Sequence, residues 1–137
     1  MKSWFLIFFL SVIGKSIFSQ QIRVGVYRDY EIKRITFSNN GFSYSIFGDT
    51  TDFGAILQNE FVDLIQTNDK KIELFIGVLS KGKFSKINLI ETQSNSSITL
   101  TPTIPTIKER KYKNDFEITP SENGLTIVNI VDMNNYL

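Results

Sequence analysis

The feature of the sequence that most limits its fold is a series of short runs in which apolar and polar residues alternate. These runs recur from residue 22 to residue 131 and are separated by clusters of Asn, Gly, Ser and Asp. A period of two residues is typical of a β-strand, and the separating residue types favour turns. No stretch keeps the i, i+3, i+4 apolar spacing long enough to predict a helix. We therefore expect an all-β domain, mainly an antiparallel sheet or a small β-sandwich.

The first half of this region predicts six strands joined by polar turns. The strands are expected at 22–26, 32–38, 42–47, 54–58, 61–67 and 72–78. We expect 32–38 and 42–47 to pair as a hairpin, because Asn40-Gly41 between them adopts the positive φ angles of a tight turn. Further turns are expected at Gly48–Asp52, Asn68-Asp69 and Ser80–Lys83.

The second half predicts a strand at 86–91 and a short one at Ile98–Leu100 that the following prolines end. A second hairpin is expected from 115–119 and 125–131, turning at Pro120–Gly124. The arm 125–131 is nearly continuous in apolar residues. We therefore expect this strand to be central and buried on both faces.

The residue pattern at the N-terminus predicts that the protein is exported. Lys2 precedes an uncharged, largely apolar run from Trp4 to Gly14, and Ser19 offers a small residue at a cleavage point. This pattern predicts a helical signal peptide over 1–19 and a mature domain over 20–137, in the periplasm, the cell envelope or outside the cell. The apolar run is shorter than the roughly 20 residues of a membrane span. The alternative is an uncleaved anchor, which would be the chain's contact with a membrane.

The amino-acid composition excludes several classes of catalytic and metal site. Histidine and cysteine are absent, which excludes imidazole bases, thiolate nucleophiles and the usual zinc and iron–sulfur sites. Without Lys2 and Lys15, 13 basic residues face 14 acidic ones, a net charge of −1. This balance argues against nucleic-acid binding. The densest basic stretch, Lys108–Lys113, is interpreted as a charged strand edge that discourages edge pairing, with a polyanion site as the alternative. No cofactor is expected.

Paired carboxylates remain as candidate catalytic groups. The close pairs are Asp49 with Asp52, Asp29 with Glu31, and Asp115 with Glu117. The first pair belongs to a turn, where Asp often caps its own backbone, or could bind calcium weakly. The other two pairs are predicted at alternate strand positions, on one solvent-facing side of a sheet. We interpret all three pairs as structural.

Aromatic residues offer a second kind of site. They could form a sugar-stacking face or, at strand spacing, belong to the core and to cross-strand pairs. These residues are Tyr27, Tyr30, Tyr44, Tyr112, Phe37, Phe42 and Phe47. Asn95-Ser96-Ser97 matches a glycosylation acceptor.

One motif order carries a resemblance to a known family. It begins with Arg110-x-Tyr112-x-Asn114, continues through a hairpin turn, and ends with Asn129, Asp132, Tyr136 and Leu137. This order resembles the N-terminal region of the SpoIID/LytB family, the stage II sporulation protein D and amidase-enhancer proteins. Ile22–Val26, directly after the leader, is also similar to the first strand of such proteins. Asn114 replaces a Gly that is frequent in the family, and Asn also accepts a positive φ.

The resemblance implies a role in peptidoglycan remodelling. Family members are lytic transglycosylases or enhancers of cell-wall amidases, and their catalytic glutamate follows the Tyr-Leu pair, beyond Leu137 here. Glu122 is predicted in an exposed turn and is a poor proton donor. We therefore expect a non-catalytic domain, truncated before the catalytic segment, that partners cell-wall glycan or wall-remodelling enzymes. On this reading Ile127, Val128, Ile130 and Val131 would be exposed. The alternative is a complete envelope-exposed module that binds glycan or a partner protein.

Overall fold

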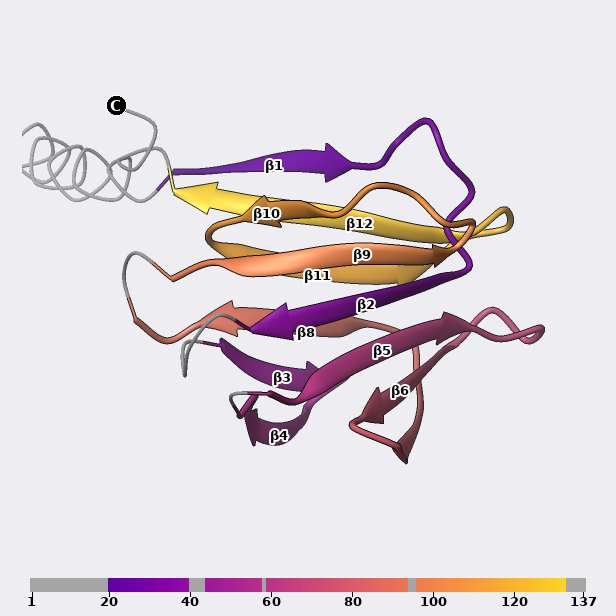
Figure 1. Ribbon diagram of the computed structural model, residues 1–137, viewed down its shortest axis with the longest axis horizontal. Coiled ribbons are helices and arrows are strands. Elements are labelled where there is room, and N and C mark those ends of the chain that lie inside the picture. Colours follow the sequence, from indigo (N-terminus) through magenta and orange to yellow (C-terminus); the bar gives the residue numbers. More distant parts are fainter. Residues whose placement is uncertain (1–19, 40–43, 58, 94–95, 133–137) are drawn as a thin grey trace, which may run out of the picture.

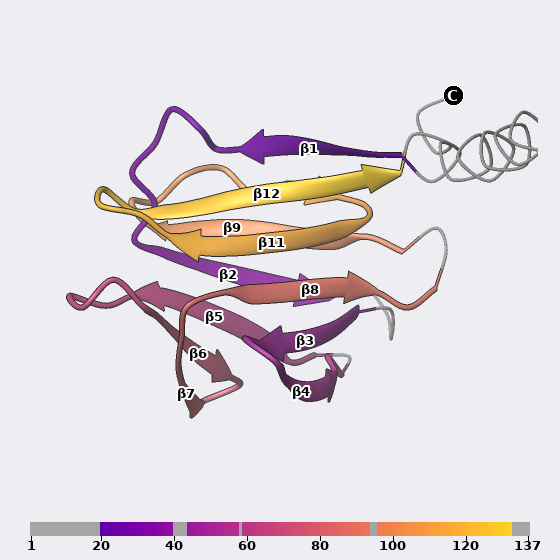
Figure 2. The same cartoon turned by 180° about the vertical axis from the view of Figure 1, so that it is seen from behind.

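The computed structural model describes residues 20–39, 44–57, 59–93 and 96–132, which form two six-stranded antiparallel sheets. The first sheet has the order β1-β12-β11-β8-β3-β4, and the second has the order β10-β9-β2-β5-β6-β7. Figure 1 views the molecule with β9, β2 and β5 of the second sheet in front, and Figure 2 with β12, β11 and β8 of the first. The expected all-β class is confirmed, and the arrangement is a sandwich.

The strands are short and regular. Their bounds are β1 Gln21–Val26, β2 Arg34–Asn39, β3 Tyr44–Gly48, β4 Thr51–Ala55, β5 Phe61–Gln66, β6 Ile72–Ile76, β7 Leu79–Phe84, β8 Ile87–Glu91, β9 Ile98–Ile104, β10 Arg110–Tyr112, β11 Asp115–Pro120 and β12 Leu125–Asp132. The described residues contain no helix able to cross a membrane. The expected signal peptide, the Asn40-Gly41 turn, Asn95, Tyr136 and Leu137 lie outside the described residues.

A single apolar core lies between the sheets. Alternate residues of β2, β3, β5, β6, β8, β9, β11 and β12 point into it, as the period of two predicts. Phe37 of the second sheet contacts Phe116 of the first edge to face, with ring centroids 5.9 Å apart. Tyr112 contacts the same Phe116 ring at 5.8 Å. Burial of each large side chain contributes on the order of 1.5–3 kcal/mol, so this core is what joins the sheets.

The prediction that 32–38 and 42–47 pair as a hairpin is wrong. β2 pairs with β5 and β9 in the second sheet, whereas β3 pairs with β4 and β8 in the first. Both edges of β2 are therefore occupied and leave no place for β3. The buried faces of the two strands, with Ile35 and Phe37 on β2 and Tyr44 and Ile46 on β3, belong to opposite layers of the sandwich.

The prediction that the strand at 125–131 is buried on both faces is also wrong. β12 lies between β1 and β11, as an interior strand should, but only one of its faces is buried. Ile127 and Val131 point into the core, at 2% and 7% exposure. The opposite face, with exposed Thr126 and half-buried Val128, is not covered by any strand of the described residues. The expected exposure of Ile127 and Val131 therefore does not occur.

Two local predictions need correction. Pro102 does not end β9; it is buried within the strand, beside a register shift in the pairing with β2, and such bulges tolerate proline. Ser80–Lys83 is part of β7 and not a turn, because the chain turns earlier, at Gly77-Val78.

Other elements are confirmed. The turn at Asn68-Asp69 and the β11–β12 hairpin form where expected. Of the turn expected at Gly48–Asp52, only Asp49-Thr50 is a turn, because β4 begins at Thr51, and the strand expected at 54–58 therefore lies earlier, at Thr51–Ala55. β10, within the basic stretch, is an edge strand of the second sheet, as expected.

Candidate functional site

Two connections meet at one end of the first sheet. They are the loop 27–33 between β1 and β2 and the turn 121–124 between β11 and β12. The Leu125 amide donates a hydrogen bond to the Ile32 carbonyl oxygen at 2.7 Å. A Cβ atom at Gly124 would lie 2.8 Å from that same oxygen, so the close approach of the two segments requires glycine.

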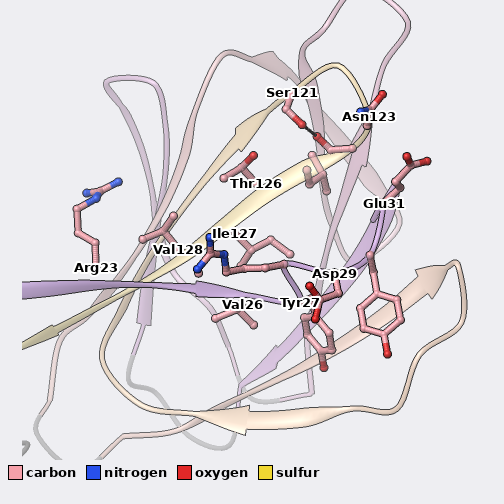
Figure 3. A pocket seen from close by; sticks show the side chains of 15 residues that line it. Arg23, Val26, Tyr27, Asp29, Glu31, Ser121, Asn123, Thr126, Ile127 and Val128 are labelled. Carbon is pink, nitrogen blue, oxygen red and sulfur yellow. Dashed lines mark hydrogen bonds between the residues drawn. The ribbon is translucent and has the colours of Figure 1, made fainter.

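The two connections and the adjoining strands enclose a pocket of about 760 Å³ (Figure 3). Its lining combines charged, polar and aromatic side chains with an apolar floor. The lining residues are Arg23, Gly25, Val26, Tyr27, Arg28, Asp29, Tyr30, Glu31, Ser121, Asn123, Gly124, Leu125, Thr126, Ile127 and Val128. Figure 3 shows Arg23 and Glu31 at opposite ends of the pocket.

Tyr27 anchors the start of the loop. Its side chain is buried and its hydroxyl donates a hydrogen bond to the Lys108 carbonyl oxygen at 3.0 Å, in the segment that leads to β10. Arg110 covers the ring, with the guanidinium carbon 4.4 Å from the ring centroid. Burial raises the pKa of Tyr27 to about 12, so the hydroxyl keeps its proton at neutral pH. These contacts tie the loop to the second sheet.

Tyr30 presents an aromatic ring at the pocket. It contacts Tyr27 edge to face at 6.5 Å, which holds the ring in place. The side chain is nevertheless 48% exposed. A held but accessible ring is the arrangement that stacking on a ligand requires.

Ion pairs define the other end of the pocket. Arg23 pairs with Glu117, which also lies 3.8 Å from the Lys86 ammonium. The three side chains come from β1, from β11 and from the residue before β8, on the outer face of the first sheet.

The three predicted carboxylate pairs have different surroundings in the structure, and the first pair binds backbone amides. Asp49 Oδ1 accepts the amides of Ser85 and Lys86, both at 3.0 Å, and Asp52 Oδ1 accepts the Gly54 amide at 2.7 Å. Both therefore cap backbone groups, as the structural interpretation requires.

Asp115 and Glu117 occupy alternate positions on β11, as expected. Asp115 Oδ1 accepts the Glu91 amide at 2.7 Å, and burial raises the pKa of Asp115. Asp29 and Glu31 were predicted on a strand, but they lie in the loop 27–33 and line the pocket. Glu122 is in an exposed turn, as expected, and is paired with Lys70 at 3.5 Å. Among the described residues, no three acidic side chains gather where they could hold a metal ion.

The motif residues of the sequence resemblance hold β10, β11 and β12 together. Asn129 is buried and its Nδ2 donates to the carbonyl oxygens of Lys113, at 2.8 Å, and Asp115, at 2.9 Å. Asn114 has a φ of 72°, so the expected positive φ is confirmed, and its carbonyl oxygen accepts the Tyr44 hydroxyl at 2.7 Å.

The remaining motif residues also lie outside the pocket. Arg110 stacks on Tyr27, Tyr112 packs on Phe116, and Asp132 ends β12 opposite Gln21. Of the residues of the resemblance, only those in Ile22–Val26, in the hairpin turn and at the start of β12 line the pocket.

Sequence reasoning missed most of the pocket. Arg28, Asn123 and Thr126 carry no motif, and their proximity depends on which loops the strand order brings together. The one usable signal was Gly124, since a glycine after Asn in a turn often marks a close backbone approach. Of the aromatic candidates, Tyr44 and Phe37 belong to the core, Tyr27 belongs to the core and lines the pocket, and Tyr30 lines the pocket with an exposed ring.

Comparison with known proteins identifies no relative. No protein-family model matches the chain, and no curated protein or solved structure matches it. The case for function therefore rests on the pocket and on the sequence.

Proposed function

We propose that the chain is an exported, non-catalytic β-sandwich domain that binds cell-wall glycan in the pocket between the loop 27–33 and the β11–β12 turn. The observation that carries the proposal is the accessible ring of Tyr30, held beside hydrogen-bonding side chains at the rim of a pocket built on a packed sandwich. The resemblance to SpoIID/LytB proteins supports glycan as the ligand through its motif order.

The lining matches the chemistry of a sugar. The C–H face of a pyranose ring stacks on an aromatic ring, and its hydroxyl groups both donate and accept hydrogen bonds. Tyr30 supplies the stacking surface. Asp29 and Glu31 supply acceptors, Arg28 supplies donors, and Asn123 supplies both.

Binding, and not cleavage, is the role that these side chains support. Cleavage of a glycosidic bond needs a carboxylic acid of raised pKa next to the leaving oxygen. Burial raises the pKa of Asp115, but Asp115 does not line the pocket and its Oδ1 accepts the Glu91 amide.

Export is the second part of the proposal and rests on the apolar run that follows Lys2. N-terminal sequencing of the protein recovered from cell fractions tests it. We expect an exported protein that begins at Gln20. Recovery of the intact Met1 form from the cytosol alone would contradict export.

Co-sedimentation of the purified full-length protein with cell-wall sacculi tests glycan binding. We expect the protein to pellet with sacculi, and Tyr30→Ala to weaken binding about fivefold, because an aromatic stacking contact contributes about 1 kcal/mol. Lys81→Ala, on β7 and outside the pocket, is the control and should bind as the parent does. Protein that stays in the supernatant with sacculi, or pelleting that requires an added wall-remodelling enzyme, would overturn direct glycan binding.

A further inference from the structure

The side chain of Arg28 lies across strand β1. A Cβ atom built at Gly25 would be 2.5 Å from Arg28 Cδ, 2.7 Å from Cγ and 3.2 Å from Nε. Arg28 therefore occupies the place where any residue other than glycine at position 25 would put its own side chain. Gly25 is directly opposite Val128 in the register, so this place is on the outer face of the first sheet, in the pocket.

The charge of Arg28 has no partner within the described chain. Arg28 forms no ion pair and no hydrogen bond with another described side chain, although Asp29 and Glu31 line the same pocket. Arg23, two positions before Gly25 and on the same face of β1, is paired with Glu117. The pocket thus holds one arginine whose charge is offset and one whose guanidinium is free to bind a ligand.

An unpaired arginine in the lining of a pocket suits a carboxylate ligand. The guanidinium is always charged, is planar, and presents donors that match the two oxygens of a carboxylate. The aliphatic part of Arg28 is held against the Gly25 backbone, so less side-chain freedom remains to be lost on binding. Glu31 lies at the end opposite Arg23, where its carboxylate can accept sugar hydroxyls.

Resting on the proposed glycan-binding function, we propose that this pocket selects glycans that carry a carboxylate, with Arg28 as the group that binds it. Gly25 is the positioning residue that leaves space for Arg28 across β1. The chemical class of ligand is an acidic oligosaccharide, whose uronate-type sugar lies over Gly25 and Val128.

Calorimetric titration of the full-length protein with two matched tetrasaccharides tests the proposal. Hyaluronan tetrasaccharide alternates glucuronate with N-acetylglucosamine, and chitotetraose contains N-acetylglucosamine alone. We expect the hyaluronan fragment to bind at least tenfold more tightly. Arg28→Gln should remove this preference and leave the affinity for chitotetraose within twofold, Arg28→Lys should keep part of the preference, and Lys81→Gln should change neither affinity.

A double-mutant cycle tests the role of Gly25. Gly25→Ala should displace the Arg28 side chain and reduce the preference for the acidic ligand at least fivefold, with an unchanged circular dichroism spectrum. In the Arg28→Gln background, Gly25→Ala should have no further effect on the preference, because the side chain that it displaces is gone. A reduction of equal size in both backgrounds would show that Gly25 does not act through Arg28.

The outcomes separate this inference from the function on which it rests. Binding of neither tetrasaccharide at millimolar concentration would overturn the glycan-binding function and the inference together. Binding of chitotetraose with no gain for the hyaluronan fragment, or a gain that survives in Arg28→Gln, would overturn the inference alone.

Discussion

At the scale of single residues, several buried polar side chains have backbone partners. Asn129 bridges the carbonyl oxygens of Lys113, just before β11, and Asp115, at its start, and the Tyr27 hydroxyl donates to the Lys108 carbonyl oxygen. Such a partner removes the cost of desolvating the group, so these residues fix the register of strands and loops without chemistry of their own. The sequence resemblance selected several residues of this kind.

Asp115 gives a pH-dependent prediction. Burial raises its pKa in the folded protein, so the folded state binds this proton more tightly than the unfolded state does. The contribution of Asp115 to stability is therefore greatest below its unfolded pKa and decreases as the pH rises through the folded value. Asp115→Asn keeps an oxygen that can accept the Glu91 amide and carries no charge.

We expect Asp115→Asn to raise the free energy of unfolding at pH 7 by about 0.5 kcal/mol, a small effect because solvent screens this half-buried group. At pH 3 the difference from the parent should vanish. Urea unfolding at both pH values measures it. A variant that is less stable at pH 7 would show that the negative charge itself stabilises the fold.

At the scale of elements, the sequence predicts the strands much better than it predicts their partners. The alternation of Ile35 and Phe37 identifies β2, and the alternation of Tyr44 and Ile46 identifies β3. Whether two such strands pair depends on which edges the rest of the chain has occupied, and a local turn signal does not contain that information. Asn40-Gly41 predicts a hairpin, but β5 and β9 take both edges of β2.

The close approach at Gly124 gives a prediction at this scale. Gly124→Ala would place a Cβ atom 2.8 Å from the Ile32 carbonyl oxygen, and moving the two backbone segments apart would lengthen the Leu125–Ile32 hydrogen bond. We expect a loss of about 2–3 kcal/mol in the free energy of unfolding. Gly54→Ala is the matched control, since Gly54 has a φ of 82° and open space around it.

Gly54→Ala should lower the free energy of unfolding by only about 1 kcal/mol, the cost of placing a side chain at a positive φ. Thermal or urea unfolding of the two variants measures both losses. Equal losses would contradict the steric account of the loop-to-turn contact.

At the scale of the whole molecule, two sheets place their connections at the ends of the sandwich, and binding sites often form on such connections. The period of two in the sequence predicts the all-β class. It does not predict the pocket, because the lining residues come from two segments about 95 residues apart that only the strand order brings together. β1 and β12, the first and last strands of the described chain, pair side by side in the first sheet. The sequence offered Tyr30 as one of seven aromatic candidates, and exposure distinguishes it.

The most direct test of the central claim is a ¹H–¹⁵N correlation titration of the labelled full-length protein with chitotetraose. The account predicts that the amide shifts concentrate in 23–31 and 121–128, the two segments that line the pocket. A second accessible apolar surface provides the contrast, because Val78 and Leu79 at the β6–β7 turn are 94% and 62% exposed. Shifts that concentrate around Val78 and Leu79, or no shifts at millimolar ligand, would contradict the account.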